Sequence, residues 1–138
     1  MGLTMGNDNR LAGRGVFVVE DEPLVALMIE AMIEELGAVV IGSARRLPDA
    51  LDFVAARHQE IDVALLDLNL GGIASYDVAQ AASDQGIPVV FSTGYDDEAI
   101  SEPWRSLPLL SKPFQLAQLE DALASAVVTR RARGRAQG

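Results

Sequence analysis

The chain has 138 residues, which is enough for one domain with a sizeable core but not comfortably for two. Hydrophobic residues make up 49% and charged residues 22% of it, the balance of a globular protein in water. The absence of cysteine excludes disulfides, thiolate metal sites and cysteine nucleophiles, and the formal net charge of -9 argues against a nucleic-acid-binding surface. No apolar run reaches the length of a membrane span and the first residues lack a signal-peptide core, so we expect a cytoplasmic protein.

Short apolar runs alternate with amphipathic patterns along the chain. Residues 1–13 are polar and contain glycine, and we expect them to be disordered. The predicted strands cover residues 15–19, 38–44, 62–67, 87–93 and 107–114. The predicted helices cover residues 23–36, 47–58, 74–86 and 115–131. This alternation predicts an α/β domain over residues 14–129, with a parallel sheet and helices on both of its faces.

The first predicted helix has recognisable ends. Pro23 suits its first turn, and Gly37 suits the position just after its last turn. Its apolar residues follow the three-four spacing of an amphipathic helix, and they include Leu24, Leu27, Met28, Ala31 and Met32. From this spacing we expect Met28 and Met32 to lie in the core.

Four arginines lie in the last nine residues, at positions 130, 131, 133 and 135. We interpret residues 130–138 as a basic, solvated tail with a frayed end. A contact with an acidic partner or a membrane surface is the alternative.

The segment between the fourth and fifth predicted strands breaks the regular alternation. Only residues 96–101 are compatible with a helix and Pro103 interrupts the pattern, so we expect a short or irregular fourth helix. Trp104, Leu107 and Leu109 cluster beside it. They either close the core or form part of a partner-binding face.

Charged and polar residues end four of the predicted strands. Glu20 and Asp21 follow the first strand, Asp67 ends the third, Thr93 ends the fourth, and Lys112, the only lysine, ends the fifth. The carboxyl ends of parallel strands share one edge of the sheet, so these side chains should meet in one crevice. Carboxylates crowded together need raised pKa values or a cation, and oxygen ligands without histidine or cysteine favour Mg²⁺. A carboxylate beside such a cation and a lysine is well placed to attack a phosphoryl group and hold it as an acyl phosphate.

The four segments VFVVEDEPLV, VALLDLNLGG, VVFSTGY and LLSKPF resemble the signature segments of the receiver domain of two-component response regulators. The resemblance extends over roughly residues 15–129, and all four segments occur in the right order. It implies a flavodoxin-like, doubly wound sheet of five parallel strands in the order 2-1-3-4-5.

The resemblance also implies roles for single residues. Asp67 would be the phosphoacceptor and a Mg²⁺ ligand, Asp21 a direct ligand, Glu20 a ligand acting mainly through water, and Asn69 a ligand through its backbone carbonyl. The phosphate-binding residues would be Thr93, Gly94 and Lys112, and the switch residues Thr93, Tyr95 and Leu109. A cis peptide bond between Lys112 and Pro113 is implied as well.

The function implied is that of a single-domain response regulator. It would take a phosphoryl group from a sensor histidine kinase or a histidine phosphotransfer protein and act through a downstream protein partner. The FSTGY segment resembles the Phe-Ala-Thr-Gly-Tyr motif of receivers linked to HWE-type kinases, with Ser92 in place of alanine. The chain would not be an enzyme beyond its own phosphorylation and dephosphorylation.

Two alternatives stay open. The chain could be a phosphate sink or a relay intermediate without an output of its own. A more remote alternative is a metal-dependent phosphohydrolase, but Asn69 stands where haloacid-dehalogenase-like phosphatases carry a second aspartate as general acid.

Leu109 departs from the family pattern, because many receivers carry tyrosine or phenylalanine at this position. The usual coupling between an aromatic rotamer and Thr93 is therefore not expected. We hypothesise instead that residues 95–107 themselves form the switch and become more ordered on phosphorylation.

Overall fold

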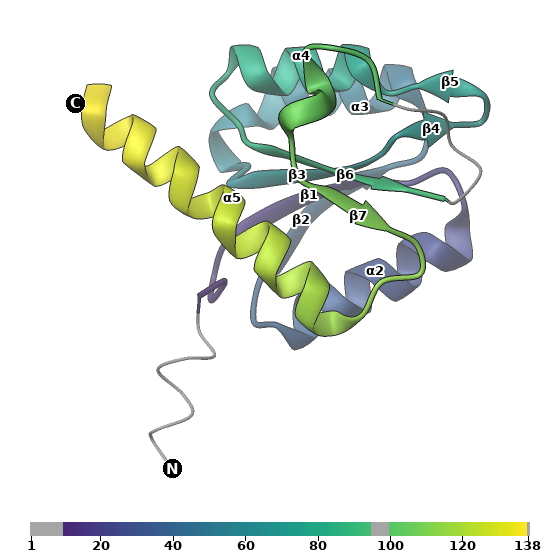
Figure 1. Ribbon diagram of the computed structural model, residues 1–138, viewed down its shortest axis with the longest axis horizontal. Helices are drawn as coiled ribbons and strands as arrows, with labels where there is room; N and C mark the ends of the chain where they lie inside the picture. The colour runs from purple at the N-terminus through teal and green to yellow at the C-terminus, as the bar shows by residue number, and fades with distance from the viewer. Residues whose placement is uncertain (1–9, 95–99, 138) are drawn as a thin grey trace.

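The computed structural model describes the backbone of residues 10–94 and 100–137, and within these ranges the side chains up to residue 128. Five parallel strands form one sheet in the order β2-β1-β3-β6-β7 (Figure 1). The strands are β1 (Gly15–Val19), β2 (Val39–Ala44), β3 (Val63–Asp67), β6 (Val89–Thr93) and β7 (Leu109–Ser111). The predicted flavodoxin-like sheet and its strand order are confirmed.

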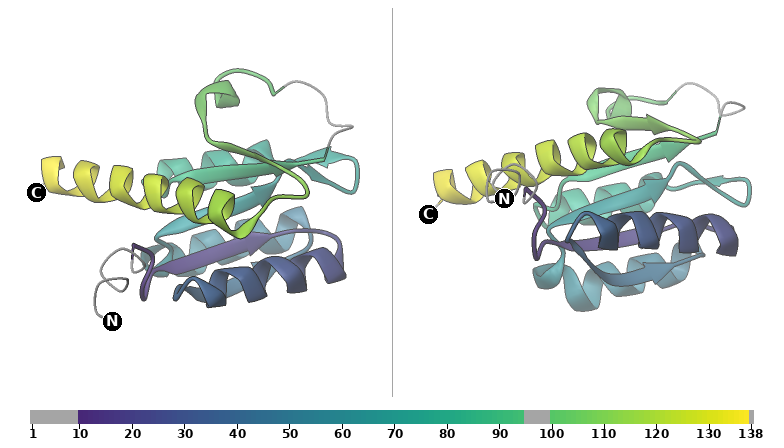
Figure 2. Two further views of the ribbon diagram at one scale, coloured as in Figure 1. Left: turned by 60° about the horizontal axis from the view of Figure 1, so that its bottom comes forward. Right: turned by 90° about the horizontal axis from the view of Figure 1, so that it is seen from below.

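Helices cover both faces of this sheet (Figures 1 and 2). On one face lie α3 (Leu47–Arg57) and α4 (Tyr76–Asp84), and on the other lie α2 (Pro23–Glu35) and α5 (Leu116–Gln137). Every residue of β1, β3 and β6 is buried, as expected for central strands packed on both sides. The apolar side chains of the sheet thus form two separate core layers, one under each pair of helices.

The backbone of α5 stays helical to Gln137, past residue 129, where we expected the domain to end. The far end of this helix projects beyond the sheet (Figure 1). Within the described residues, no helix is both long enough and apolar enough to cross a lipid bilayer.

The prediction that Met28 lies in the core is wrong. Its side chain is 60% exposed, and the residues of α2 that face the sheet are Ala26, Ile29 and Ile33. Apolar residues occur at most positions of this helix, so the three-four spacing fits more than one face. The second methionine of the prediction, Met32, is partly buried and packs against the core.

A two-stranded antiparallel hairpin follows β3 and was not predicted. It consists of β4 (Asn69–Leu70) and β5 (Ile73–Ala74), joined by Gly71 and Gly72. Both glycines have positive φ, +62° and +95°, a conformation that other residues rarely adopt. A two-residue Gly-Gly loop between short strands is a common hairpin turn.

Part of the irregular segment after β6 lies outside the described residues, which resume at Ile100. The prediction of a helix at residues 96–101 therefore falls largely on undescribed residues. Between Ile100 and β7, the described chain forms only a single 3₁₀ turn, η2 (Trp104–Ser106).

Trp104 closes one end of the core. Its ring stacks on Tyr76 with centroids 6.3 Å apart and meets Phe91 edge-on at 6.5 Å. Leu107 packs against the same core layer, whereas Leu109 is 45% exposed. Of the two interpretations of this cluster, core closure therefore holds for Trp104 and Leu107 but not for Leu109.

Candidate functional site: an acidic pocket at the strand ends

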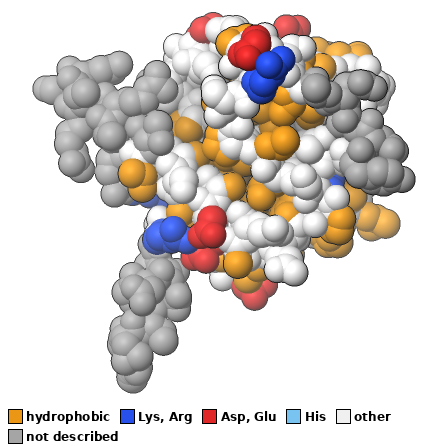
Figure 3. Space-filling view, in the orientation of Figure 1, with side chains coloured by type: hydrophobic (Ala, Val, Ile, Leu, Met, Phe, Trp, Pro, Cys, Tyr) orange, Lys and Arg blue, Asp and Glu red, His pale blue; other side chains and the backbone are white. Residues whose placement is uncertain are grey.

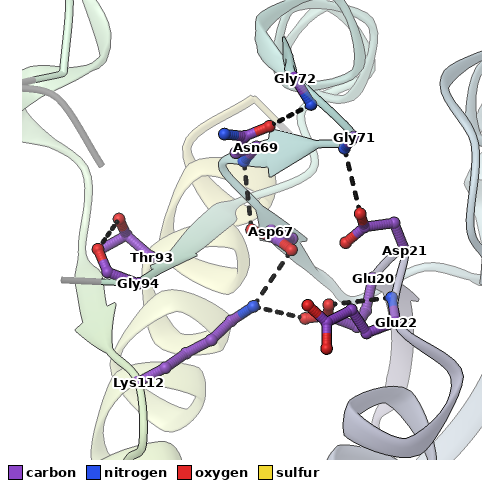
Figure 4. A network of polar contacts seen from close by, with 10 residues as sticks. All are labelled: Glu20, Asp21, Glu22, Asp67, Asn69, Gly71, Gly72, Thr93, Gly94 and Lys112. Carbon is purple, nitrogen blue, oxygen red and sulfur yellow. Dashed lines mark hydrogen bonds and ion pairs between the residues drawn. The ribbon is translucent and has the colours of Figure 1, made fainter. Parts of the chain in front are cut away.

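Three carboxylates meet where β1 and β3 end (Figure 4). Glu20 follows β1 and is 1% exposed, and Asp67 ends β3 and is 5% exposed. The two strands pair in register, Val19 beside Leu66, so the residues that follow come together. Glu20, Asp21 and Asp67 can each offer a carboxylate oxygen, with these oxygens within 4.8 Å of one another.

Lys112 connects two of these carboxylates (Figure 4). Its ammonium nitrogen lies 2.8 Å from Glu20 Oε1 and 3.1 Å from Asp67 Oδ2. The backbone N–H of Lys112 donates to the carbonyl of Thr93, which extends the β6–β7 pairing by one residue and fixes the stem of the lysine. The peptide bond between Lys112 and Pro113 is cis, as the resemblance implied.

The β4–β5 hairpin holds the other side of the pocket. The N–H of Asn69 donates to Asp67 Oδ1 at 3.1 Å, and the N–H of Gly71 donates to Asp21 Oδ2 at 3.1 Å. The side-chain oxygen of Asn69 accepts from the N–H of Gly72 at 2.6 Å. Sequence reasoning did not include Gly71 or Gly72 in the site, although the Gly-Gly pair itself was a signal for a tight turn at this point.

The pocket strongly perturbs the titration of Asp67. Burial raises the pKa of Asp67 to about 7, the charge of Glu20 adds to the rise, and Lys112 and the N–H of Asn69 oppose it. Burial alone would lower the pKa of Lys112, but its hydrogen bond to Glu20 and the charge of Asp67 outweigh burial and raise it. One ammonium group thus faces an excess of carboxylates, which favours binding of a further cation.

The donor set of the pocket fits a hard divalent cation. Its ligand atoms are carboxylate oxygens from Glu20, Asp21 and Asp67, with a backbone hairpin beside them. Mg²⁺ prefers oxygen ligands, needs few carboxylates and keeps several waters, which the partial exposure of Asp21 would allow.

The remaining predicted site residues lie along β6 and β7. Thr93 ends β6 at the rim of the pocket, and its hydroxyl donates to the carbonyl of Gly94 at 3.1 Å (Figure 4). Leu109 lies at the start of β7, beside Phe91 of β6 in the sheet register. Tyr95, which we predicted as a switch residue, lies outside the described residues.

An apolar surface flanks the pocket, and a groove of mixed polarity lies along β7. On α2, Leu24, Leu27 and Met28 are exposed, and a cavity of about 350 Å³ runs from this helix to Lys112 and Phe114. The groove, of about 500 Å³, lies between β7 and α5, where Figure 3 shows apolar side chains gathered at the surface.

Comparisons with known proteins identify the family and agree with the fold. The family model described as "Response regulator receiver domain" matches residues 16–124. The chain is 38% identical to SdrG from Sphingomonas melonis Fr1, with a TM-score of 0.74, over 84% of this chain and 97% of that one.

Two longer relatives are also similar. The phyllosphere-induced regulator PhyR of Methylorubrum extorquens is 32% identical over 81% of this chain and 43% of its own length. The response regulator PhyR from Brucella abortus, known from a crystal structure, has 29% sequence identity to this chain. The two structures align with a TM-score of 0.79 over 98% of this chain and 57% of that one. The chain thus spans about half the length of these PhyR proteins. Because the family model covers most of the chain, the chain belongs to the response-regulator receiver domain family.

Proposed function

We propose that the chain is a phosphorylation switch in which Asp67 accepts a phosphoryl group from the phosphohistidine of a sensor kinase or phosphotransfer protein. The observation that carries this proposal is the pair of contacts from Lys112 to Glu20 and Asp67 at the carboxyl edge of the sheet. A lysine placed in this way can exchange a carboxylate partner for a phosphoryl oxygen without moving its backbone.

The chemistry follows from the groups in the pocket. An oxygen of Asp67 attacks phosphorus, the bond from phosphorus to the histidine nitrogen breaks, and the freed electron pair stays on the imidazole. When bound at Glu20, Asp21 and Asp67, Mg²⁺ supplies charge neutralisation for the phosphoryl oxygens. Lys112 then holds one of these oxygens, and the hydroxyl of Thr93 turns from the carbonyl of Gly94 to donate to another.

The exposed side of α2 is our candidate for docking the phosphodonor. Leu24, Leu27 and Met28 form an apolar patch that continues into the cavity ending at Lys112. A helix that carries the phosphohistidine could bury this patch while its histidine reaches Asp67. The FSTGY segment favours a kinase of the HWE type. We also propose a cytoplasmic location, because such kinases phosphorylate themselves with ATP in the cytoplasm.

The proposal also includes a downstream protein partner. This partner would bind the surface around Thr93 and β7, where Leu109 is exposed beside the groove on α5. A phosphate sink or relay would share the acceptor chemistry but need no such reader. The phosphohydrolase alternative is disfavoured, because Asn69 gives the pocket an amide where those enzymes need a second acid.

The test is labelling by acetyl phosphate and by a phosphorylated histidine kinase in the presence of Mg²⁺. Wild-type protein should take up one phosphoryl group per chain and lose it in hydroxylamine, as an acyl phosphate does. Asp67→Asn should take up none, while Asp52→Asn, which removes an exposed carboxylate from α3, should label normally. Full labelling of Asp67→Asn would refute the proposal, and continued turnover of phosphate esters would favour the hydrolase.

A further inference from the structure

A third cavity opens beside the acidic pocket, at Asp21 and on the side away from Lys112 (Figure 4). It has a volume of about 600 Å³. Arg45 and Arg46 line it from the loop after β2, Leu70 and Ile73 line it from the β4–β5 hairpin, and Asp21 forms the wall that it shares with the acidic pocket. The cavity therefore combines an apolar lining with two arginines on one side and the carboxylate of Asp21 on the side of the acidic pocket.

The two arginines of this cavity are adjacent and, like Arg14, form no ion pair among the described residues. Arg10, Arg57, Arg105 and Lys112 each form an ion pair with a carboxylate. Arg45 and Arg46 form no ion pair with any described residue, although acidic residues outnumber basic ones by 20 to 11. Two adjacent guanidinium groups without a carboxylate partner present a site for an external anion.

The fold of the domain does not need the side chain of Arg46. This residue is the N-cap of α3 through its backbone alone, with no capping hydrogen bond from its side chain. Both arginines are exposed. Their charge is therefore available for a contact outside the chain.

The position of the cavity points to one occupant. Asp21 lines it, and the carboxylate of Asp21 comes within 4.8 Å of that of Asp67. A macromolecule that brings a phosphoryl group to Asp67 must cover Asp21, and its neighbouring surface then lies over the cavity. Ile73, which is 57% exposed, offers that surface an apolar contact next to the two charges.

We propose that this cavity, named here the Arg45–Arg46 subsite, docks the phosphodonor protein by receiving an acidic side chain flanked by an apolar one. The inference rests on the proposed function, since it assumes a protein donor for Asp67. A small phosphodonor such as acetyl phosphate needs only the acidic pocket. The carboxylates of the acidic pocket repel acidic protein surfaces, and the two arginines would offset this repulsion. The subsite would therefore favour donors that carry an acidic side chain at this position.

The test compares a protein donor with a small one. The variant Arg45→Gln/Arg46→Gln removes both charges, and Arg45→Lys/Arg46→Lys keeps them. Arg57→Gln is the matched control, because it removes an exposed arginine from the far end of α3 that is paired with Glu60. The donors are acetyl phosphate and whichever kinase of a phosphorylated histidine-kinase panel labels the wild-type chain fastest.

We expect the double Gln variant to lose about tenfold in kcat/KM with the kinase, mainly through KM, and to stay within about twofold of wild type with acetyl phosphate. The double Lys variant should recover most of the loss, and the dependence of the kinase reaction on salt should weaken in the Gln variant. Kinase kinetics equal to those of Arg57→Gln would overturn the inference. An equal loss with both donors would also overturn it, because the arginines would then act on the acceptor itself. If neither donor labels wild-type protein, the proposed function fails instead.

Discussion

Replacing Asp67 with asparagine should stabilise the protein in the absence of Mg²⁺, and only at neutral and alkaline pH. Burial and the charge of Glu20 raise the pKa of Asp67 from 3.8 to about 7. Between these two values the folded protein binds a proton that the unfolded chain has released. The free energy of unfolding of wild-type protein must therefore fall as pH rises through this window.

The size of the effect follows from the shift. One pKa unit corresponds to about 1.4 kcal/mol, so between pH 5 and pH 8 this single carboxyl group should cost the folded state about 2.5 kcal/mol. Asparagine has the same shape and cannot ionise, and its side-chain oxygen can still accept the N–H of Asn69. The stability advantage of Asp67→Asn should thus grow by about 2.5 kcal/mol from pH 5 to pH 8.

Urea unfolding in EDTA at several pH values measures this difference directly. Asp52→Asn on the surface of α3 removes the same formal charge and serves as the control, with a nearly constant offset from wild type. Saturating Mg²⁺ should reduce the pH dependence of wild-type protein, because the cation favours the ionised carboxylate. Parallel curves for wild type and Asp67→Asn would refute the electrostatic description of the pocket.

Three further outcomes follow from the structure. Asp21→Ala should abolish Mg²⁺ binding in calorimetry and raise the Tm of the metal-free protein by a few degrees. The repulsion among carboxylates within 4.8 Å of one another should outweigh the hydrogen bond that Asp21 accepts from Gly71, and a fall in Tm would contradict this. Met28→Glu should reduce phosphotransfer from a kinase about tenfold and leave labelling by acetyl phosphate unchanged, with equal loss from both donors as the contrary result. Hydrogen exchange at residues 100–107 should slow when Mg²⁺ and beryllofluoride occupy the site, and unchanged exchange at confirmed occupancy would exclude this segment as the switch.

The sheet and the meeting of the site residues could be predicted because both depend on short-range patterns. An apolar run ending in a carboxylate shows where a buried strand stops, and parallel strands deliver their ends to one edge. These two rules are sufficient to predict that Glu20, Asp67 and Lys112 lie close together, as the structure shows. The roles proposed for them remain predictions that labelling and metal binding can check.

The exposed face of α2 could not be predicted in the same way. Its residues are apolar around most of the helix, so periodicity offered two overlapping faces and gave no reason to reject Met28. Only packing against the sheet selects Ala26, Ile29 and Ile33. The excess of apolar residues that misled the prediction is also what leaves a hydrophobic surface beside the pocket.

The geometry of the pocket depends on the register in which the two strands of the hairpin after β3 pair. Asn69 pairs with Ala74 and Leu70 with Ile73, and the turn between them places the N–H of Gly71 on Asp21. Side-chain changes at position 69 would leave its backbone carbonyl, the proposed metal ligand, where the ladder holds it. Inserting or deleting one residue would shift the ladder and turn that carbonyl to the opposite side. Substitution at Asn69 removes the hydrogen bond from Gly72 but keeps the register, so the loop should tolerate it better than a change in length, which is the reverse of what a surface loop usually permits.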